Sequence, residues 1–144
     1  LGDVYKRQTE RNWRFLTPFK GVLSPWPTHM RIENPRHQLH AHREDDFLDF
    51  LLTDIENGVW HYRRDPRIVR PLAESIRQST EGIRYLKPEL VLLFKAKNSR
   101  SQERTKDQQD FETVLPHLDL EARAWLRWGL TLLYSDHEWI GQLV

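Results

Sequence analysis

The distribution of apolar and polar residues divides the chain into a strand-rich first part and a helical second part. Residues 13–27 are rich in aromatic side chains and are interrupted by proline and glycine, as is typical of short strands joined by turns. The run at 46–52 is short, apolar and aromatic, which predicts a buried strand. Asn57-Gly58 predicts a turn, and residues 59–62 after it predict another strand.

Helical signals dominate from Pro88 onward. Pro88 itself suits the first turn of a helix, because proline at the first helical position loses no hydrogen bond that the helix needs. The polar residues 98–106 predict an exposed connection, and Asp107 and Asp119 are each suited to cap a helix that follows. Residues 68–76 fit either a short helix or an extended segment. The wide apolar face expected of the last helix is formed by Leu120, Arg123, Ala124, Trp125, Leu126, Trp128, Leu130, Leu133 and Tyr134.

This order of elements predicts an α+β fold in which a sheet precedes about three packed helices. Residues 1–8 resemble the translation of a sequencing adapter, so we set them apart from the fold and expect the natural protein to begin upstream of Thr9. Residues 9–84 are then the expected sheet domain and residues 85–144 the helical domain.

Composition narrows the classes of function. The 144 residues carry 22 basic and 21 acidic side chains, a balance that argues against a general nucleic-acid binder. The absence of cysteine excludes thiolate zinc sites and cysteine nucleophiles. No apolar run approaches the roughly 20 residues that cross a bilayer, so we expect a cytoplasmic protein without a membrane partner.

Asp49 is the most informative candidate for chemistry. In an extended strand Phe47, Asp49 and Leu51 share one face, while Asp46 points to the other. A carboxylate within a buried strand is costly unless it is paired, hydrogen-bonded or bound to a metal. A structural ion pair or an edge-strand position, and a metal or acid/base role, are therefore both open, and a metal site would need further ligands from elsewhere.

Other polar clusters have simpler explanations beside the functional ones. Lys95, near the end of a helix, is suited to offset the dipole of the last carbonyl groups. The arginines at 63, 64, 67 and 70 could bind phosphate, or form local ion pairs with nearby acidic residues. The histidines at 37, 40 and 42 include a pair at i and i+2, which alone does not make a metal site. The sequence contains no Gly-rich phosphate loop, no G-x-S-x-G and no H-E-x-x-H motif.

Four segments together carry a resemblance to a known family. They are FLDFLL (47–52), WHYRRDPRI (60–68), GIRYLKPELVLLFKAK (82–97) and KDQQDF (106–111). From about Trp13 onward the chain resembles the C-terminal two thirds of bacterial nucleotidyltransferases related to the aminoglycoside and lincosamide adenylyltransferases. The tract YLKPELVLLFKAK followed by KDQQDF is its most specific part.

The resemblance implies a polymerase-β-like mixed sheet, truncated here, followed by a small helical bundle. In that family a Gly-Ser or Gly-Gly motif precedes a D-x-D pair, and a third carboxylate follows on a later strand. These carboxylates hold Mg²⁺, which aligns a nucleoside triphosphate, expected to be ATP, for attack by the hydroxyl group of a small molecule. By position Asp49 corresponds to the third carboxylate and thus to a catalytic metal ligand. Lys95 becomes a candidate for contact with the triphosphate, and Asp107 and Asp110 are expected to help cap and pack the helical domain.

One departure from the family pattern is severe, because no D-x-D occurs anywhere in the sequence. We therefore expect the chain by itself to lack the magnesium site and to be inactive. Three hypotheses remain. In the first, the chain is part of a Mg²⁺-dependent nucleotidyltransferase, and Asp49 lies beside an exposed sheet edge. In the second it is a non-catalytic nucleotide- or protein-binding module of the same fold, and in the third it is an interaction module in which Asp49 pairs with an arginine such as Arg43. The acceptor and the oligomeric state are not indicated by the sequence.

Overall fold

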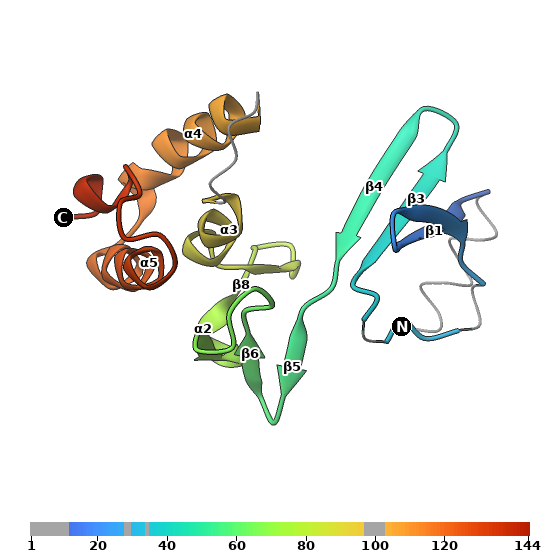
Figure 1. Cartoon of the computed structure of the whole chain (residues 1–144), viewed down its shortest axis with the longest axis horizontal. Coiled ribbons are helices and arrows are strands. Elements are labelled where there is room, and N and C mark those ends of the chain that lie inside the picture. Colours follow the sequence, from blue (N-terminus) through green and yellow to red (C-terminus); the bar gives the residue numbers. More distant parts are fainter. Residues whose placement is uncertain (1–11, 28–29, 34, 97–102) are drawn as a thin grey trace. The chain divides into compact units, whose positions relative to one another are not determined.

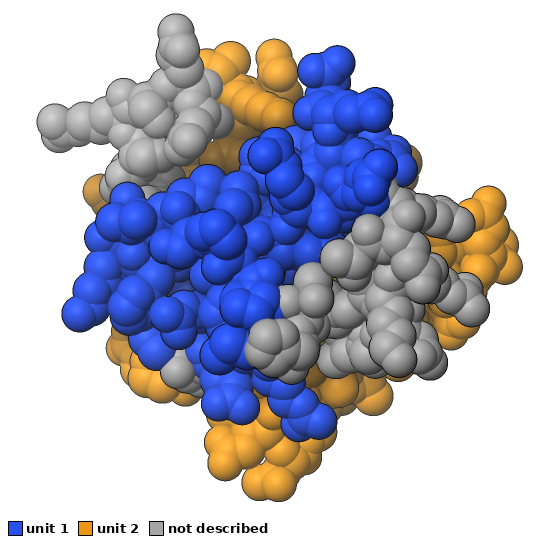
Figure 2. All heavy atoms as spheres, turned by 90° about the vertical axis from the view of Figure 1, so that its right-hand side faces the viewer, with its two compact units in different colours: residues 1–54 blue, residues 55–144 orange. Residues whose placement is uncertain are grey.

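A computed structural model describes residues 12–27, 30–33, 35–96 and 103–144. The chain divides into two units, residues 1–54 and residues 55–144, which are coloured separately in Figure 2. Residues 1–8, the suspected adapter sequence, lie outside the described residues. The boundary expected at residues 84 and 85 falls inside unit 2.

Unit 1 contains a four-stranded antiparallel sheet (Figure 1) with the strand order β2-β1-β3-β4. Lys20 and Gly21 join the first two strands with φ angles of 51° and 79°, a left-handed conformation that favours glycine. The strands and turn expected within residues 13–27 are thereby confirmed. The four strands are β1 (Arg14–Phe19), β2 (Val22–Pro25), β3 (Gln38–Arg43) and β4 (Asp46–Leu51).

The core of unit 1 lies on one face of this sheet. Phe15, Leu39 and Ala41 occupy alternate positions of β1 and β3 and are buried, and Trp26 packs with them. On the same face the buried Thr17 hydroxyl donates a hydrogen bond of 3.0 Å to the Gln38 carbonyl oxygen. This small cluster is the only buried apolar group among the described residues of unit 1.

The expected strand at 46–52 is confirmed as β4, but the expectation that it is buried is wrong. All six residues of β4 are exposed, with Phe47 at 53% and Leu51 at 67%. The reason is its position, because within the described sheet β4 pairs with β3 and lies at the end of the strand order. An apolar run favours a strand, but it does not show whether other elements cover that strand.

A three-stranded sheet in the order β5-β6-β7 opens unit 2, apart from Asp54, the first residue of β5, which is the last residue of unit 1. The turn predicted at Asn57-Gly58 is confirmed, since both residues have positive φ angles, 49° and 77°, as a two-residue hairpin turn requires. The segment 68–76, which fitted two interpretations, contains both a strand and a single helical turn. The elements are β5 (Asp54–Glu56), β6 (Val59–His61), β7 (Val69–Pro71), α2 (Leu72–Ser75) and the hairpin β8 (Ile76–Gln78) with β9 (Arg84–Leu86).

The rest of unit 2 is helical (Figure 1), with Pro88 in the first turn of α3 as expected. The Asp119 side chain caps α5 by accepting a hydrogen bond of 2.8 Å from the Ala122 N–H, which confirms that prediction. The cap predicted at Asp107 is wrong, because α4 begins four residues earlier, in a polar segment of good helix formers. The elements are α3 (Pro88–Lys95), α4 (Glu103–Val114), η1 (Leu115–His117), α5 (Leu120–Leu133) and η2 (Ile140–Gln142).

The core of unit 2 joins its sheet to its helices. Gly129 of α5 allows close packing against α3, since a Cβ atom there would lie 3.1 Å from a methyl carbon of Leu93. The apolar face expected for α5 is confirmed for Leu126 and Leu130 and wrong for Leu120, Ala124 and Trp128, which are exposed, Leu120 at 80%. The buried apolar residues are Trp60, Tyr62, Ile68, Leu90, Leu92, Leu93, Ala96, Phe111, Leu118, Ala122, Leu126, Leu130, Trp139 and Leu143.

The architecture is α+β, with small sheets and separate helices, as the sequence predicts. Within the described part of the chain, no helix has the length and apolar character needed to cross a membrane.

Candidate functional site

Asp49 lies near the middle of β4, directly opposite His40 of β3. Its carboxylate Oδ1 lies 3.9 Å from Nε2 of His40, and the Asp49 side chain is 34% exposed. Within the described sheet β4 is paired on one side only, so the edge-strand position, one of the alternatives left open for this residue, is confirmed for the described part of the chain. Asp49 is accessible from solvent, with a histidine as its nearest ionisable neighbour among the described residues.

The strand register places aromatic and basic side chains on the same face of the sheet as Asp49. His42 is paired with Phe47, so His40, His42 and Phe47 lie next to one another on this face. The Phe47 ring lies 4.9 Å from the His42 ring and 5.5 Å from the His40 ring, centroid to centroid. Asp49 therefore lies beside an aromatic cluster whose central ring, that of Phe47, is half exposed.

The pairing of Arg43 differs from the one considered in the third hypothesis. The Arg43 guanidinium binds the Asp46 carboxylate and lies over the Trp13 ring, 4.7 Å from its centroid. Arg43 and Asp46 are opposite each other in the register of β3 and β4, which explains why this pair forms. The proposed ion pair between Arg43 and Asp49 is wrong.

The donor set around Asp49 does not form a complete metal site. Within the described residues there is no group of three or more histidine, aspartate or glutamate side chains placed to hold a metal ion. His37 turns its Nδ1 towards the Pro35 carbonyl oxygen, at 3.2 Å. Mg²⁺ prefers an octahedron of oxygen ligands, so a cation at Asp49 would need carboxylates beyond those of the described chain.

Lys95 lies in the last turn of α3 and binds two carboxylates of α4. Its Nζ is 3.1 Å from Asp107 Oδ1 and 2.7 Å from Asp110 Oδ2. The hydrogen bond to Asp110 is the main cause of a raised pKa of Lys95, which burial partly opposes. Asp107 and Asp110 thus connect α4 to α3, and a phosphate group at Lys95 would compete with both carboxylates.

The arginines that follow β6 mostly bind groups of the protein itself. Arg64 donates a hydrogen bond of 2.7 Å to the Phe94 carbonyl oxygen, and Arg67 forms an ion pair of 2.6 Å with Asp65. Hydrogen bonds from Arg67 lower the pKa of the Asp65 carboxyl group to about 2. Local pairing, the alternative to phosphate binding, therefore describes Arg64 and Arg67.

Arg70 is buried, and its main partner could not be predicted from the sequence. Its Nη1 lies 2.8 Å from Oε1 of Glu89, and the two side chains are 4% and 1% exposed. Tyr62, another buried polar side chain of unit 2, has its pKa raised mainly by burial, and its hydroxyl group donates to the Leu93 carbonyl oxygen at 3.2 Å. Both arrangements are structural, because Arg70, Glu89 and Tyr62 are all buried in unit 2.

Comparison of the chain with protein-family models, curated proteins and solved structures found no match in any of the three.

Proposed function

We propose that the chain is part of a Mg²⁺-dependent nucleotidyltransferase with a polymerase-β-like fold, in which Asp49 is the third carboxylate. The intact enzyme transfers a nucleoside monophosphate from a nucleoside triphosphate, ATP in the first instance, to a hydroxyl group of a small molecule. Aminoglycoside-like and lincosamide-like compounds are the acceptors to test first. The described residues by themselves do not fit the magnesium site, so the chain alone is inactive.

The observation that supports this proposal is the position of Asp49 on an exposed edge strand. The nucleotidyltransferase hypothesis expects Asp49 beside an uncovered sheet edge, and β4 lies at the end of its described sheet. A further strand paired with β4 would place side chains on the same face within about 5 Å of Asp49. A D-x-D strand at this edge would supply the carboxylates that the described residues lack.

The decisive test replaces Asp49 by asparagine in the parent enzyme, which retains the size and hydrogen-bonding capacity of the side chain but removes its charge. We expect kcat/KM for nucleotide transfer to fall by roughly a hundredfold or more, a loss typical of removing a group that acts on the reacting atoms. The assay follows release of pyrophosphate from ATP with candidate acceptors.

Asp46→Asn is the matched control, because Asp46 belongs to the same strand, points to the other face and binds Arg43. It removes the same charge from β4 and should leave kcat/KM within about threefold of the wild type. Equal activity of Asp49→Asn and the wild type would contradict the assignment of Asp49.

The second candidate is a non-catalytic nucleotide- or protein-binding module of the same fold. It differs from the first candidate in expecting no set of metal ligands around Asp49, even in the intact gene. Sequencing the gene across the codons for Gln8 and Thr9 separates the two candidates. A Gly-Ser motif followed by D-x-D upstream supports the enzyme, and a reading frame that begins near Thr9 supports the binding module.

A further inference from the structure

Helix α5 carries a second apolar stripe on the side away from the core. Leu120, Ala124 and Trp128 follow one another at intervals of four residues, which places them on one side of the helix. All three are exposed, Leu120 at 80% and Trp128 at 46%. An exposed series of this kind marks a binding surface more often than a single exposed apolar side chain does.

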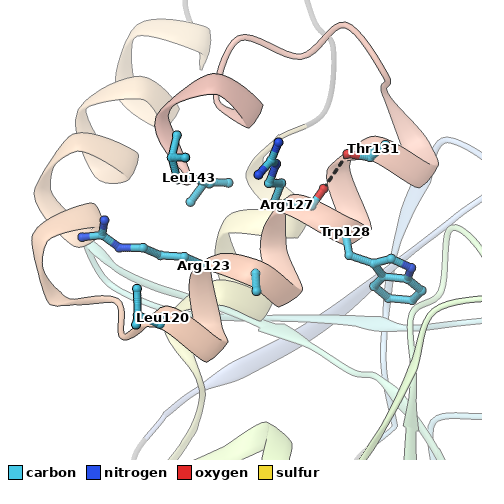
Figure 3. A pocket seen from close by; sticks show the side chains of 8 residues that line it. Leu120, Arg123, Arg127, Trp128, Thr131 and Leu143 are labelled. Atoms are coloured by element: carbon cyan, nitrogen blue, oxygen red, sulfur yellow. Dashed lines mark hydrogen bonds between the residues drawn. The ribbon is translucent and has the colours of Figure 1, made fainter.

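Two residues near the end of the chain turn this stripe into a groove. The buried Leu143 and the exposed Val144 line it together with the stripe, and it encloses about 530 Å³. Figure 3 shows Leu120 and Trp128 at the two ends of the stripe, with Arg127 extending between them on the side of Leu143. We call this surface the α5 groove; its lining residues are Leu120, Arg123, Ala124, Arg127, Trp128, Thr131, Leu143 and Val144.

The side chains that line the α5 groove include two positive charges and no acidic group. Arg123 is fixed by the helix end before α5, where it donates to the carbonyl oxygens of Leu115 and Leu118, both at 3.1 Å. Arg127 is exposed and, within the described residues, forms no ion pair. An anionic partner would therefore meet two guanidinium groups one helical turn apart.

The groove is too open to enclose a small molecule. Of its lining residues only Leu143 is buried, whereas pockets for small ligands cover most of the ligand surface. The groove runs along α5 from Leu120 to Thr131, about 16 Å, which is the length of a three-turn helix. Trp and Arg are also the residues that contribute most to protein interfaces.

We propose that the α5 groove binds an amphipathic α-helix of a partner protein that has acidic residues along both edges of its apolar face. Large apolar side chains of this helix pack against Leu120, Ala124 and Trp128, and its carboxylates bind Arg123 and Arg127. The partner differs in chemistry from the substrates of the proposed enzyme, so each proposal can be correct or wrong independently of the other.

The test uses two labelled synthetic peptides of about three helical turns, with leucine at every third or fourth position. One peptide carries glutamate on both edges of the leucine face, and the other carries lysine at the same positions. We expect the whole chain to bind the glutamate peptide roughly tenfold more tightly than the lysine peptide, as measured by fluorescence anisotropy. Arg127→Glu should reverse this preference, and Trp128→Ala should weaken binding of the glutamate peptide about tenfold.

Arg84→Glu and Tyr85→Ala are matched controls, because they change an exposed arginine and an exposed aromatic residue of unit 2 outside the groove. Both should bind the glutamate peptide like the wild type, and circular dichroism checks that every variant is folded. The same assay is repeated with dodecanoate, a small amphipathic anion, as competitor. Equal affinity for the two peptides, or control variants that lose as much affinity as Trp128→Ala, would overturn the proposal. Binding of dodecanoate but of neither peptide would overturn it as well.

Discussion

A single arginine connects several elements of unit 2. The Arg70 guanidinium binds Glu89, lies 3.5 Å from Glu121 and 3.8 Å from Glu74, and is 5.1 Å from the Trp125 ring centroid. Burial of an unpaired charge costs several kcal/mol, so the partner that matters most is the one that is also buried, Glu89. The second carboxylate oxygen of Glu89, Oε2, has no hydrogen-bond partner within the described residues, so Arg70 is the main group that stabilises the buried negative charge of Glu89.

Removing one member of this pair should destabilise the fold more than removing both. We expect Glu89→Ala to lower the free energy of unfolding by about 3 kcal/mol, because it leaves the Arg70 charge buried without its main partner. The double variant Arg70→Met, Glu89→Leu replaces both charges by apolar groups and should lose less than Glu89→Ala. Urea denaturation of the three proteins measures the difference, and a double variant less stable than Glu89→Ala would contradict this account.

Residue contacts of this kind could not be predicted from the sequence. Glu89 follows Pro88 and suits the first turn of a helix, and that local role gives no sign of a contact with a residue 19 positions earlier. The same holds for Asp49, whose nearest ionisable neighbour, His40, is set by the register of β3 and β4. A carboxylate within an apolar run indicates that Asp49 needs a compensating interaction, but which residue lies opposite Asp49 depends on strand pairing.

At the level of elements, signals that depend on adjacent residues were reliable. The Asn57-Gly58 turn and the Asp119 cap each require only a few neighbouring residues, and both are confirmed. The burial of β4 and the start of α4 were predicted wrongly. Burial depends on what covers a strand, and a polar segment without apolar residues still forms a helix when its residues have high helix propensity.

The ion pairs of Lys95 connect α3 to α4 and make part of the stability depend on pH. Lys95 has a raised pKa in the folded protein, so its contribution is fully present below the unfolded value of 10.5 and is lost as the pH rises through the folded pKa. We expect the unfolding midpoint to fall above about pH 10.5, and to fall less in Lys95→Met, which has no charge to lose.

Thermal unfolding of both proteins between pH 9 and 12 measures this difference. Tyr62 also has a raised pKa, and its contribution is likewise lost at alkaline pH, so Tyr62→Phe is the control that separates the two groups. If the midpoints of the wild type and Lys95→Met fall in parallel, the ion pairs with Asp107 and Asp110 do not contribute to stability.

For the molecule as a whole, the two units differ in how much apolar surface they bury. Unit 2 has an extended core that joins strands and helices, whereas the buried cluster of unit 1 consists of Phe15, Trp26, Leu39 and Ala41. Unit 1 also presents β4 as an exposed strand with apolar residues on both faces. A strand edge of this kind pairs readily with another chain.

We therefore expect the chain to self-associate through β4, and Leu51→Lys to reduce this association by placing a charge on the free strand. Val22→Lys is the control, because Val22 is similarly exposed on β2, the opposite end of the sheet, where Pro25 cannot donate a backbone hydrogen bond. Sedimentation velocity at tens of micromolar protein should show assembled species for the wild type and Val22→Lys, and mainly monomer for Leu51→Lys.

Salt provides an independent check on the same surface. Asp49 places a negative charge near the middle of β4, whereas the charge of Asp46 is paired with Arg43, so two copies of this strand repel each other at Asp49 until ions screen them. Association through β4 should therefore strengthen as ionic strength rises, whereas association driven by pairs of opposite charge would weaken. A wild-type chain that stays monomeric at high salt would show that exposed apolar residues on an edge strand do not suffice for pairing. Strand twist or the cost of burying Asp49 would then have to explain why β4 does not pair with a second copy.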